Sequence, residues 1–343
     1  MNPAPLFLKL PIERRALAFA QAATQRGLDA AILEKDFWVC WLLGMLFSLP
    51  EIGPHLVFKG GTSLSKVFGV IDRFSEDVDL SVSPALVGAD AQAFEALTSR
   101  TQRDVAMAEL RALSCQKVRH FIAPLLEAEI LRELGKPRRQ ASWLSFEIDA
   151  SGSPILQFYY PATQTRGLNY LSRTVKLELG SLTDQQPAAH HNVRPWVADE
   201  IPAAFTDWRC EVTALEIART FWEKATILHA EYYRPADQAM PDRYARHYSD
   251  MARQLGHPDG AAFLADDALC TRVAVWKSRL FARSWARYDL ARKGSFRLVP
   301  LAARQPALTH DYVRMRPMFL HEPPSFDKVV QSLAEAERSV NAI

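Results

Sequence analysis

The spacing of apolar residues changes period several times along the chain, and these changes predict the order of its elements. Apolar positions at helical spacing predict a first helix at 11–26, which Gly27 ends, and a second helix at about 29–47. The most apolar part of the second helix, Val39–Leu49, is too short to span a bilayer and follows three charged residues. We therefore expect a buried helix there.

The stretch around which the chain is organised begins with a short apolar run, Leu56–Phe58, that predicts a buried strand. Gly60 and Gly61 follow directly. Three hydroxyl side chains come next, those of Thr62, Ser63 and Ser65. Apolar residues at helical spacing then predict a helix that runs to about Ile71.

A second strand follows, in which the period changes to two. Val78 and Leu80 face one way, and Asp77 and Asp79 face the other. Two carboxylates on one strand face can share Mg²⁺ or Mn²⁺, and a glycine turn that opens a helix can approach a phosphate closely. Together they favour a nucleoside triphosphate with a divalent cation. Taken separately, each half could be a solvated strand face or an ordinary turn.

A third candidate strand is Val175–Gly180, where apolar residues alternate with Lys176 and Glu178. A third carboxylate there could complete a metal site with Asp77 and Asp79, or act as a base toward an acceptor hydroxyl. The alternative is a lone exposed glutamate. Earlier patterns predict a helical stretch at 91–134 and strands at 143–148 and 155–160.

The remainder of the chain has a helical pattern from about Glu211 to its end. His190 and His191 precede it without partners at metal-ligand spacing, so a loop role is expected. Four arginines fall at helical spacing between residues 271 and 293: Arg272, Arg279, Arg283 and Arg287. Such a stripe, with the basic loop at Arg138 and Arg139, could follow an RNA backbone, although solvated helix faces often look the same.

Composition limits the class of protein without naming one. The 343 residues suffice for two domains, and 48% hydrophobic and 23% charged residues are typical of a globular protein. The net charge of +2 means that any basic surface must be local. Four scattered cysteines without Cys-x-x-Cys spacing, together with the absence of a signal-peptide pattern, indicate reduced thiols, a cytoplasmic location and no membrane association.

The order Gly60-Gly61, a helix and then Asp77-x-Asp79 on a strand resembles the polymerase-beta-type nucleotidyltransferases. The fuller string Lys59–Lys66, followed by Arg73–Leu80, is narrower and is similar to the AbiEii/AbiGii toxins of bacterial type IV toxin–antitoxin and abortive-infection systems. The gap from Gly61 to Asp77 is longer than in the generic pattern and suits the toxin branch. Ile32–Trp38 also resembles the family, as does the Leu-Glu-Leu strand after Tyr170-Leu171-Ser172-Arg173.

The resemblance implies an α/β (α+β) fold, with a polymerase-beta-type nucleotidyltransferase core and a mixed sheet at 1–205 and a helical C-terminal domain at 206–343. It implies nucleotide-binding positions in and around the glycine turn, namely Lys59, Gly60, Gly61, Thr62, Ser63, Lys66 and Ser75. By motif match it adds Lys224 and Asp250 to the catalytic set of Asp77, Asp79 and Glu178. His247 stands where the family commonly carries an acidic residue.

The implied activity is transfer of a nucleoside monophosphate from an NTP to an acceptor hydroxyl, with Mg²⁺ or Mn²⁺. The favoured acceptor is an RNA end, and tRNA is the favoured class of RNA. The implied partner is a cognate antitoxin protein. Two other readings stay open: a small-molecule nucleotidyltransferase of the antibiotic-modifying type, and a non-catalytic nucleotide-binding protein.

Overall fold

The computed structural model describes residues 6–90, 94, 96–138, 140–163, 172–181, 184–281 and 283–342. Within these, the chain separates into two compact units. The first takes in the described residues of Met1–Val67 and Ser75–Leu215, and the second those of Phe68–Phe74 and Glu216–Ile343. Arg139, Tyr170 and Leu171, which the sequence patterns single out, lie outside the described residues.

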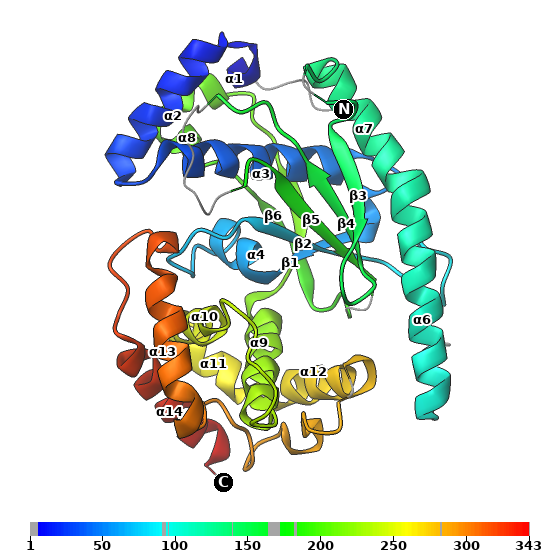
Figure 1. Cartoon of the computed structure of the whole chain (residues 1–343), viewed down its shortest axis with the longest axis vertical. Coiled ribbons are helices and arrows are strands. Elements are labelled where there is room, and N and C mark those ends of the chain that lie inside the picture. The colour runs from blue at the N-terminus through cyan, green and yellow to red at the C-terminus, as the bar shows by residue number, and fades with distance from the viewer. Residues whose placement is uncertain are drawn as a thin grey trace. The chain divides into compact units, whose positions relative to one another are not determined.

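The first unit is built on a mixed β-sheet of seven described strands (Figure 1). The strands are β1 (Leu56–Lys59), β2 (Asp77–Val82), β3 (Leu144–Ile148), β4 (Pro154–Phe158), β5 (Val175–Gly180), β6 (Ala188–Asn192) and β7 (Glu211–Leu215). Their order is β3-β4-β5-β2-β1-β7-β6. The pairs β2–β5 and β1–β7 are parallel and the other neighbours antiparallel. The expected α/β class with a mixed sheet is confirmed.

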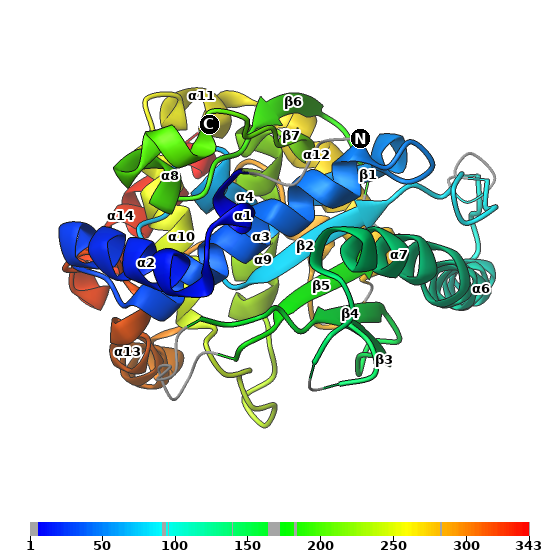
Figure 2. The ribbon, with the colours of Figure 1, turned by 90° about the horizontal axis from the view of Figure 1, so that it is seen from above.

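The helices of the first unit lie against this sheet and beyond one of its ends. They are α1 (Leu6–Lys9), α2 (Ile12–Arg26), α3 (Ala30–Ser48), α4 (Gly60–Lys66), α6 (Arg100–Lys117), α7 (Ala123–Leu134) and α8 (Val197–Glu200), with 3₁₀ turns at Gly53–His55 and Pro202–Phe205. A π-helical turn, Val118–Ile122, joins α6 to α7. Both ribbon views place α6 and α7 beside the end of the sheet that carries β3 and β4 (Figures 1 and 2).

The second unit is helical. It contains α9 (Ile217–Tyr232), α10 (Ala245–Leu255), α11 (Gly260–Ala265), α12 (Asp267–Leu280), α13 (Gln305–Arg314) and α14 (Phe326–Asn341), with 3₁₀ turns at Tyr288–Leu290, Ala302–Arg304 and Arg316–Met318. The short segment Phe68–Phe74 belongs to this unit, because Arg73 forms a β-bridge with Phe319 and the Phe74 amide donates to the Met318 carbonyl at 2.7 Å.

Local sequence signals account for the first two long helices. Gly27 adopts a left-handed conformation with φ of 65° and ends α2, as expected. The Asp29 carboxylate accepts a hydrogen bond from the Ala31 amide at 2.8 Å and caps the N-terminus of α3. The predicted helices at 11–26 and 29–47 are confirmed, and so are the two strands that form the β3–β4 hairpin.

Three predicted elements differ from the structure. The helix after the glycines ends at Lys66 instead of Ile71, because the chain passes there into the second unit and Gly69 adopts a φ of 62°. Residues 211–215 form β7 before the helical pattern begins at Ile217, so the second unit starts at Glu216 and not at 206. His190 and His191 lie on β6, not in a loop; β6 forms through antiparallel pairing with β7.

The predicted basic helix is also interrupted. The helix α12 ends at Leu280, so Arg272 and Arg279 lie on it, whereas Arg283 and Arg287 lie beyond it. Arg287 adopts a φ of 45°, which no helix interior allows, and pairs with Asp289 at 2.9 Å. The four arginines therefore do not form one helical stripe.

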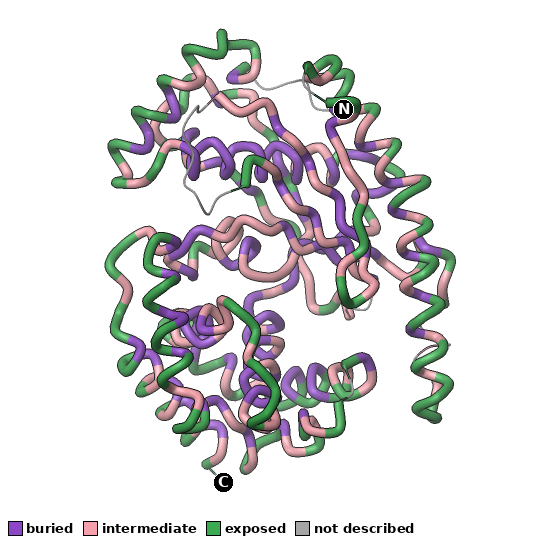
Figure 3. Tube along the Cα trace, viewed as in Figure 1, coloured by how far each residue is buried: buried purple, intermediate pink, exposed green. Residues whose placement is uncertain are grey.

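Helix α3 is buried along almost its whole length (Figure 3), as the apolar pattern predicts. Its Trp38 and Trp41 pack on Phe158 of β4, with ring centroids 5.9 and 5.6 Å apart. Phe158 shares a sheet face with its partner Val175 on β5. Helix α3 thus covers that face, and the alternate residues of β5 point to the other one.

Three consecutive charged residues of α3 are buried with it, each only 1% exposed: Glu34, Lys35 and Asp36. Glu34 accepts a hydrogen bond from the Thr163 amide at 2.6 Å. Lys35 donates to the Glu76 carboxylate at 2.8 Å and to the Ser172 carbonyl at 3.1 Å. A buried charge is tolerated only when it is paired, so each of these side chains must hold a fixed segment in place.

Asp36 binds the last residue of α4. Its carboxylate lies 2.6 Å from the Lys66 ammonium and also accepts the Trp196 amide at 2.6 Å. The Lys66 ammonium in turn lies 4.5 Å from the centre of the Trp196 ring, within cation–π range. Helix α3 thereby fixes both flanks of the organising stretch: Lys66 at the end of α4 and Glu76 directly before β2.

We predict that Lys66→Met destabilises the protein by about 3–5 kcal/mol, because it leaves the buried Asp36 carboxylate without its cation. Urea unfolding measures this. A matched control, Arg100→Met, breaks an exposed pair with Asp104 and should cost about 0.5 kcal/mol or less.

The double variant Lys66→Met with Asp36→Asn should be more stable than Lys66→Met alone, since the amide removes the buried charge and keeps an acceptor for the Trp196 amide. A cost below about 1 kcal/mol for the single variant would contradict the role assigned to the pair.

Candidate active site

The candidate site is built on the pairing of β2 with β5. These strands run parallel, with Asp77 opposite Lys176 and Asp79 opposite Glu178. Paired residues of neighbouring strands point to the same side of a sheet. Because Val78 and Leu177 are fully buried on the side that α3 covers, the four charged side chains share the opposite face. The sequence pattern predicts each strand face, and the register places the faces side by side.

The glycine turn lies directly against this row of charges. Lys59 of β1 pairs with Asp79, and Gly60, the next residue, adopts a φ of 80°. A Cβ atom on Gly60 would collide with the Asp79 carboxylate. Glycine is therefore needed twice at this position, for its conformation and for the space that the carboxylate occupies. The turn and the carboxylate form a single packed unit.

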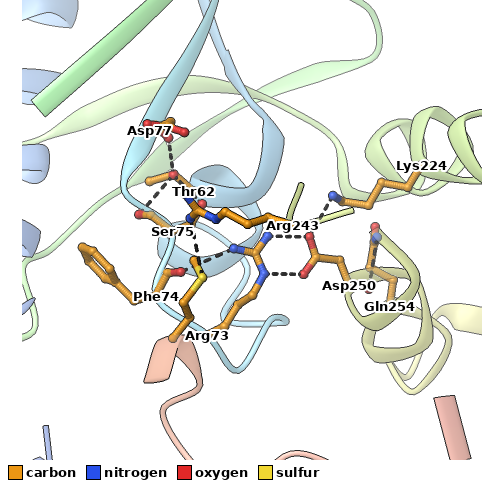
Figure 4. Close-up of polar contacts among 10 residues, drawn as sticks. Thr62, Arg73, Phe74, Ser75, Asp77, Lys224, Arg243, Asp250 and Gln254 are labelled. Atoms are coloured by element: carbon orange, nitrogen blue, oxygen red, sulfur yellow. Dashed lines mark hydrogen bonds and ion pairs between the residues drawn. The ribbon is translucent and has the colours of Figure 1, made fainter. Parts of the chain in front are cut away.

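The hydroxyl of Thr62 ties the turn to the strand that follows it. It is buried and donates to the Asp77 carbonyl, and it contacts the Ser75 hydroxyl at 3.0 Å and the Ser75 carbonyl at 3.3 Å (Figure 4). Thr62 and Ser75 thus hold the geometry of the turn with their own hydroxyls. Gly61, half-buried, lies in the first turn of α4.

Ser63, the next residue of α4, is fully buried. Its Oγ has no hydrogen-bond partner among the residues that the structure describes. A buried hydroxyl without a partner costs free energy, so it calls for an explanation such as a ligand atom. A phosphate oxygen is an acceptor that would satisfy it.

Lys176 of β5 lies among these carboxylates, opposite Asp77 and two residues before Glu178. Its ammonium lies 2.5 Å from Glu178 Oε1, and the two side chains are 32% and 37% exposed. Burial lowers the pKa of Lys176, but the hydrogen bond to Glu178 and the charges of Glu178, Asp77 and Asp79 outweigh it and raise that pKa above its ordinary value. The lysine is therefore charged, with all three carboxylates acting on it.

The fit to a divalent cation rests on two carboxylates. No three His, Cys, Asp or Glu side chains within the described ranges stand close enough together to hold a metal ion. Mg²⁺, however, is commonly held by one or two carboxylates together with substrate phosphates. Asp77 and Asp79, on one face beside the glycine turn, meet that requirement, whereas Glu178 is held by Lys176.

The second unit contains a buried charged cluster of its own (Figure 4). The Arg73 guanidinium binds the Asp250 carboxylate through two hydrogen bonds of 2.7 Å, and the Lys224 ammonium lies 2.8 Å from the same carboxylate. The three side chains are at most 8% exposed. Burial raises the pKa of Asp250, but the charges of Arg73 and Lys224 outweigh it and hold that pKa well below its usual range.

His247, one turn before Asp250 on α10, carries no charge in this environment. Burial and the positive charges of Lys224, Arg246 and Arg73 hold its pKa well below the ordinary value, against the charge of Asp250. A neutral side chain thus stands where the resemblance leads one to expect a carboxylate, and Asp250 is the carboxylate that pairs with both Arg73 and Lys224.

Lys66 and two of the four predicted RNA-binding arginines do not lie where the sequence patterns predict them. Lys66 is only 4% exposed and is bound to Asp36, so its ammonium is not available to a phosphate in this state. A phosphate contact by Lys66 would require its ammonium to leave Asp36. Arg283 and Arg287 fall outside α12, which leaves Arg272 and Arg279 as the helical pair.

Sequence reasoning missed three residues that organise these sites. Lys176 was recognisable, because it alternates in phase with Glu178 on a predicted strand. Arg73 and Lys35 were not, because their carboxylate partners lie 177 and 41 positions away in the chain. No local pattern signals such a pairing.

The sequence of the chain matches a known protein family. A family model described as "Nucleotidyl transferase AbiEii toxin, Type IV TA system" matches residues 41–332. Among solved structures, the chain is similar to MenT4, a nucleotidyltransferase toxin from Mycobacterium tuberculosis H37Rv, with 17% identity, a TM-score of 0.40 and coverage of 96% of this chain and 98% of that one. No curated protein matches the chain. None of the described helices is both long and apolar enough to cross a membrane.

We predict that Gly60→Ala destabilises the protein by about 1–3 kcal/mol for backbone strain and by a further amount for displacing the Asp79 carboxylate. The matched control is Gly27→Ala, which has a similar φ of 65° but no atom within 4 Å of the added Cβ. Urea unfolding of both variants separates strain from collision. Equal losses in the two variants would show that Asp79 does not lie against the turn.

A second prediction concerns acid stability. The pKa of Asp250 is lower in the folded chain than its unfolded value of about 3.9, so its contribution is fully present above about pH 4 and is lost as the pH falls below that. The difference in unfolding free energy between the parent and Asp250→Asn should therefore shrink between pH 5 and pH 2, by up to about 1.4 kcal/mol per pH unit.

Chemical denaturation at several pH values measures this difference, with the exposed Asp237→Asn as control. All chains carry His247→Gln, because the pKa of His247 depends on the charge of Asp250 and its titration would otherwise differ between the parent and Asp250→Asn. A difference that stays constant from pH 5 to pH 2 would contradict the buried ionised state of Asp250.

Proposed function

The chain belongs to the AbiEii family of nucleotidyltransferase toxins of type IV toxin–antitoxin systems. From this premise we propose that it transfers a nucleoside monophosphate from an NTP to a hydroxyl of an RNA, with tRNA as the favoured class of RNA. The acceptor oxygen forms a bond to the α-phosphorus, the bond from that phosphorus to the pyrophosphate breaks, and the acceptor proton passes to a base. The observation that carries the proposal is the pairing of Asp79 with Glu178 on one sheet face, with Gly60 directly against the Asp79 carboxylate.

Asp77 and Asp79 are the proposed ligands of Mg²⁺ or Mn²⁺, which would supply charge neutralisation and Lewis acidity toward the triphosphate. Gly60, Gly61 and Ser63 are the proposed phosphate contacts. The close approach of backbone to carboxylate at Gly60 and the unpartnered Ser63 hydroxyl support this assignment.

The residues next to these contacts take supporting parts. Thr62 and Ser75 maintain the turn through their mutual hydrogen bonds. Lys59, next to Gly60 and on the same face as Asp79, is a proposed phosphate contact because it makes no ion pair with any described carboxylate.

Glu178 has two possible parts in the reaction, as the base that accepts the acceptor proton or as a further metal ligand. Its place opposite Asp79 supports either part. Both parts require its carboxylate to leave Lys176, which holds it at 2.5 Å.

Lys224 is the proposed source of positive charge for the triphosphate, in keeping with its motif position, and this part requires its ammonium to leave Asp250, which it contacts at 2.8 Å. The double pairing of Asp250 with Arg73 and Lys224 supports a different part for that residue: both carboxylate oxygens are occupied, so Asp250 positions the two cations. We therefore propose Asp250 as a positioning residue.

The acceptor and partners follow from the family. Type IV toxin–antitoxin membership implies an antitoxin protein and an NTP substrate. We propose an RNA acceptor with contacts from Arg272 and Arg279, which share one face of α12, seven residues apart. A cytoplasmic location agrees with the free state of all four cysteines, Cys40, Cys115, Cys210 and Cys270.

We predict that Asp79→Asn lowers nucleotide transfer by about 10²–10³-fold or more, because a neutral amide cannot replace a metal-binding carboxylate. The fold should persist, since Asp79 is half-buried and the amide has the same shape. Glu147→Gln is the matched control: an exposed carboxylate on edge strand β3 of the same sheet, which should retain full activity.

The assay offers each of the four α-³²P-labelled NTPs with Mg²⁺ to total cellular RNA and, separately, to an RNA-free metabolite extract. Label in RNA that requires Asp79 supports the proposal. Label only in the metabolite extract would replace the RNA acceptor by a small molecule. Full activity of Asp79→Asn would refute the assignment of the carboxylates.

A further inference from the structure

Lys176 makes a contact that the reaction as proposed does not explain. On the sheet face that carries Asp77, Asp79 and Glu178, its ammonium binds Glu178 at 2.5 Å. Asp77 and Asp79 act on the same ammonium and help to raise the pKa of the lysine. Lys176 thus contacts one carboxylate of the row directly and lies in the electric field of the other two.

Lys59, on the strand at the other side of these carboxylates, differs from Lys176 in its contacts. Lys59 is opposite Asp79 on β1, yet it forms no ion pair with any residue in the described part of the chain. The neighbour of Lys176 on β4 is Gln157, which carries no charge. Of the two lysines that flank this row, Lys176 is therefore the one bound to a carboxylate.

Three like charges on adjacent positions of a sheet face repel one another unless a cation lies among them. An ammonium on a flexible four-carbon stem can supply that charge and can also withdraw it. The pair is about one-third exposed, and exposed ion pairs are weak enough to exchange partners. A buried pair such as Lys66 with Asp36 has no such freedom.

We propose that Lys176 is a displaceable counterion: it holds Glu178 and compensates the carboxylate face in the metal-free protein, and it releases Glu178 when Asp77 and Asp79 bind a divalent cation. This inference rests on the metal-binding part of the proposed function. It accounts for the observation that the described carboxylates do not form a ready three-ligand site, since Glu178 is engaged by an amine of the same strand.

The consequence is competition. A divalent cation that binds this face must displace an ammonium that already compensates the same charges, so the lysine weakens cation binding in the absence of nucleotide. Removing the ammonium while keeping the length of the side chain should strengthen that binding. This direction is the opposite of what a lysine that merely orients Glu178 for the metal would produce.

The test is a titration of the full chain with Mn²⁺ in the absence of nucleotide. Electron paramagnetic resonance measures the concentration of free Mn²⁺ at each step. Lys176→Met should bind Mn²⁺ about tenfold more tightly than the parent, the size expected for the loss of one nearby charge in a partly exposed site. Lys176→Arg, which keeps the charge, should bind close to the parent. Lys293→Met is the matched control, because it removes an exposed lysine paired with Asp267 far along the sequence, and it should change nothing.

Unchanged or weaker Mn²⁺ binding by Lys176→Met would overturn the proposal, and weaker binding would make Lys176 a positioning residue for Glu178. Circular dichroism checks that the variant is folded, and Lys176→Gln serves as a second neutral variant with the same expected gain. Equal affinities of the parent and both neutral variants, with all three folded, would be decisive against the counterion.

One further variant separates this inference from the function on which it rests. Asp79→Asn should lose the Mn²⁺ site in either background. If Mn²⁺ binds equally well without Asp79, or binds neither the parent nor Lys176→Met even with a non-hydrolysable NTP analogue present, the metal site itself is wrong and both proposals fall. If Asp79 is needed and Lys176→Met makes no difference, only the counterion falls.

Discussion

The first unit depends on a pair of buried ionic contacts from one helix. Lys35 binds Glu76 and Asp36 binds Lys66, and all four side chains lie on or beside the central helix α3. A buried charge without its partner is strongly destabilising, so the pairing fixes where α4 ends and where β2 begins. The charged string in the middle of an otherwise apolar helix therefore has a structural explanation: it holds the two ends of the segment that bears the candidate chemistry.

From this constraint the geometry of the site follows. With the end of α4 and the start of β2 held, the Thr62 hydroxyl reaches the Asp77 carbonyl, and Gly60 lies against the Asp79 carboxylate. The parallel pairing of β2 with β5 then brings Glu178 beside Asp79. The backbone proposed to bind phosphate and the carboxylate proposed to bind metal are thus adjacent because of packing and register.

Much of this was predictable from the sequence, for physical reasons. The turn at Gly60 and the strand that carries Asp77 and Asp79 were predicted because a glycine turn and period-two alternation are local signals. The partners of Arg73 and Lys35 were not, because a buried ion pair leaves no trace at a single position. The prediction of one basic helix from Arg272 to Arg287 was wrong for a related reason. Helical spacing of arginines does not show that the backbone at Arg287 adopts a left-handed conformation, which ends any helix there.

The most direct test of the central claim is the position of a divalent cation in a crystal of the protein grown with Mn²⁺ and a non-hydrolysable NTP analogue. Anomalous scattering locates the ion without reference to the rest of the density. We expect it about 2.0–2.3 Å from carboxylate oxygens of both Asp77 and Asp79, with the triphosphate against Gly60 and Gly61. An ion and triphosphate bound elsewhere, with both carboxylates free of metal, would contradict the account.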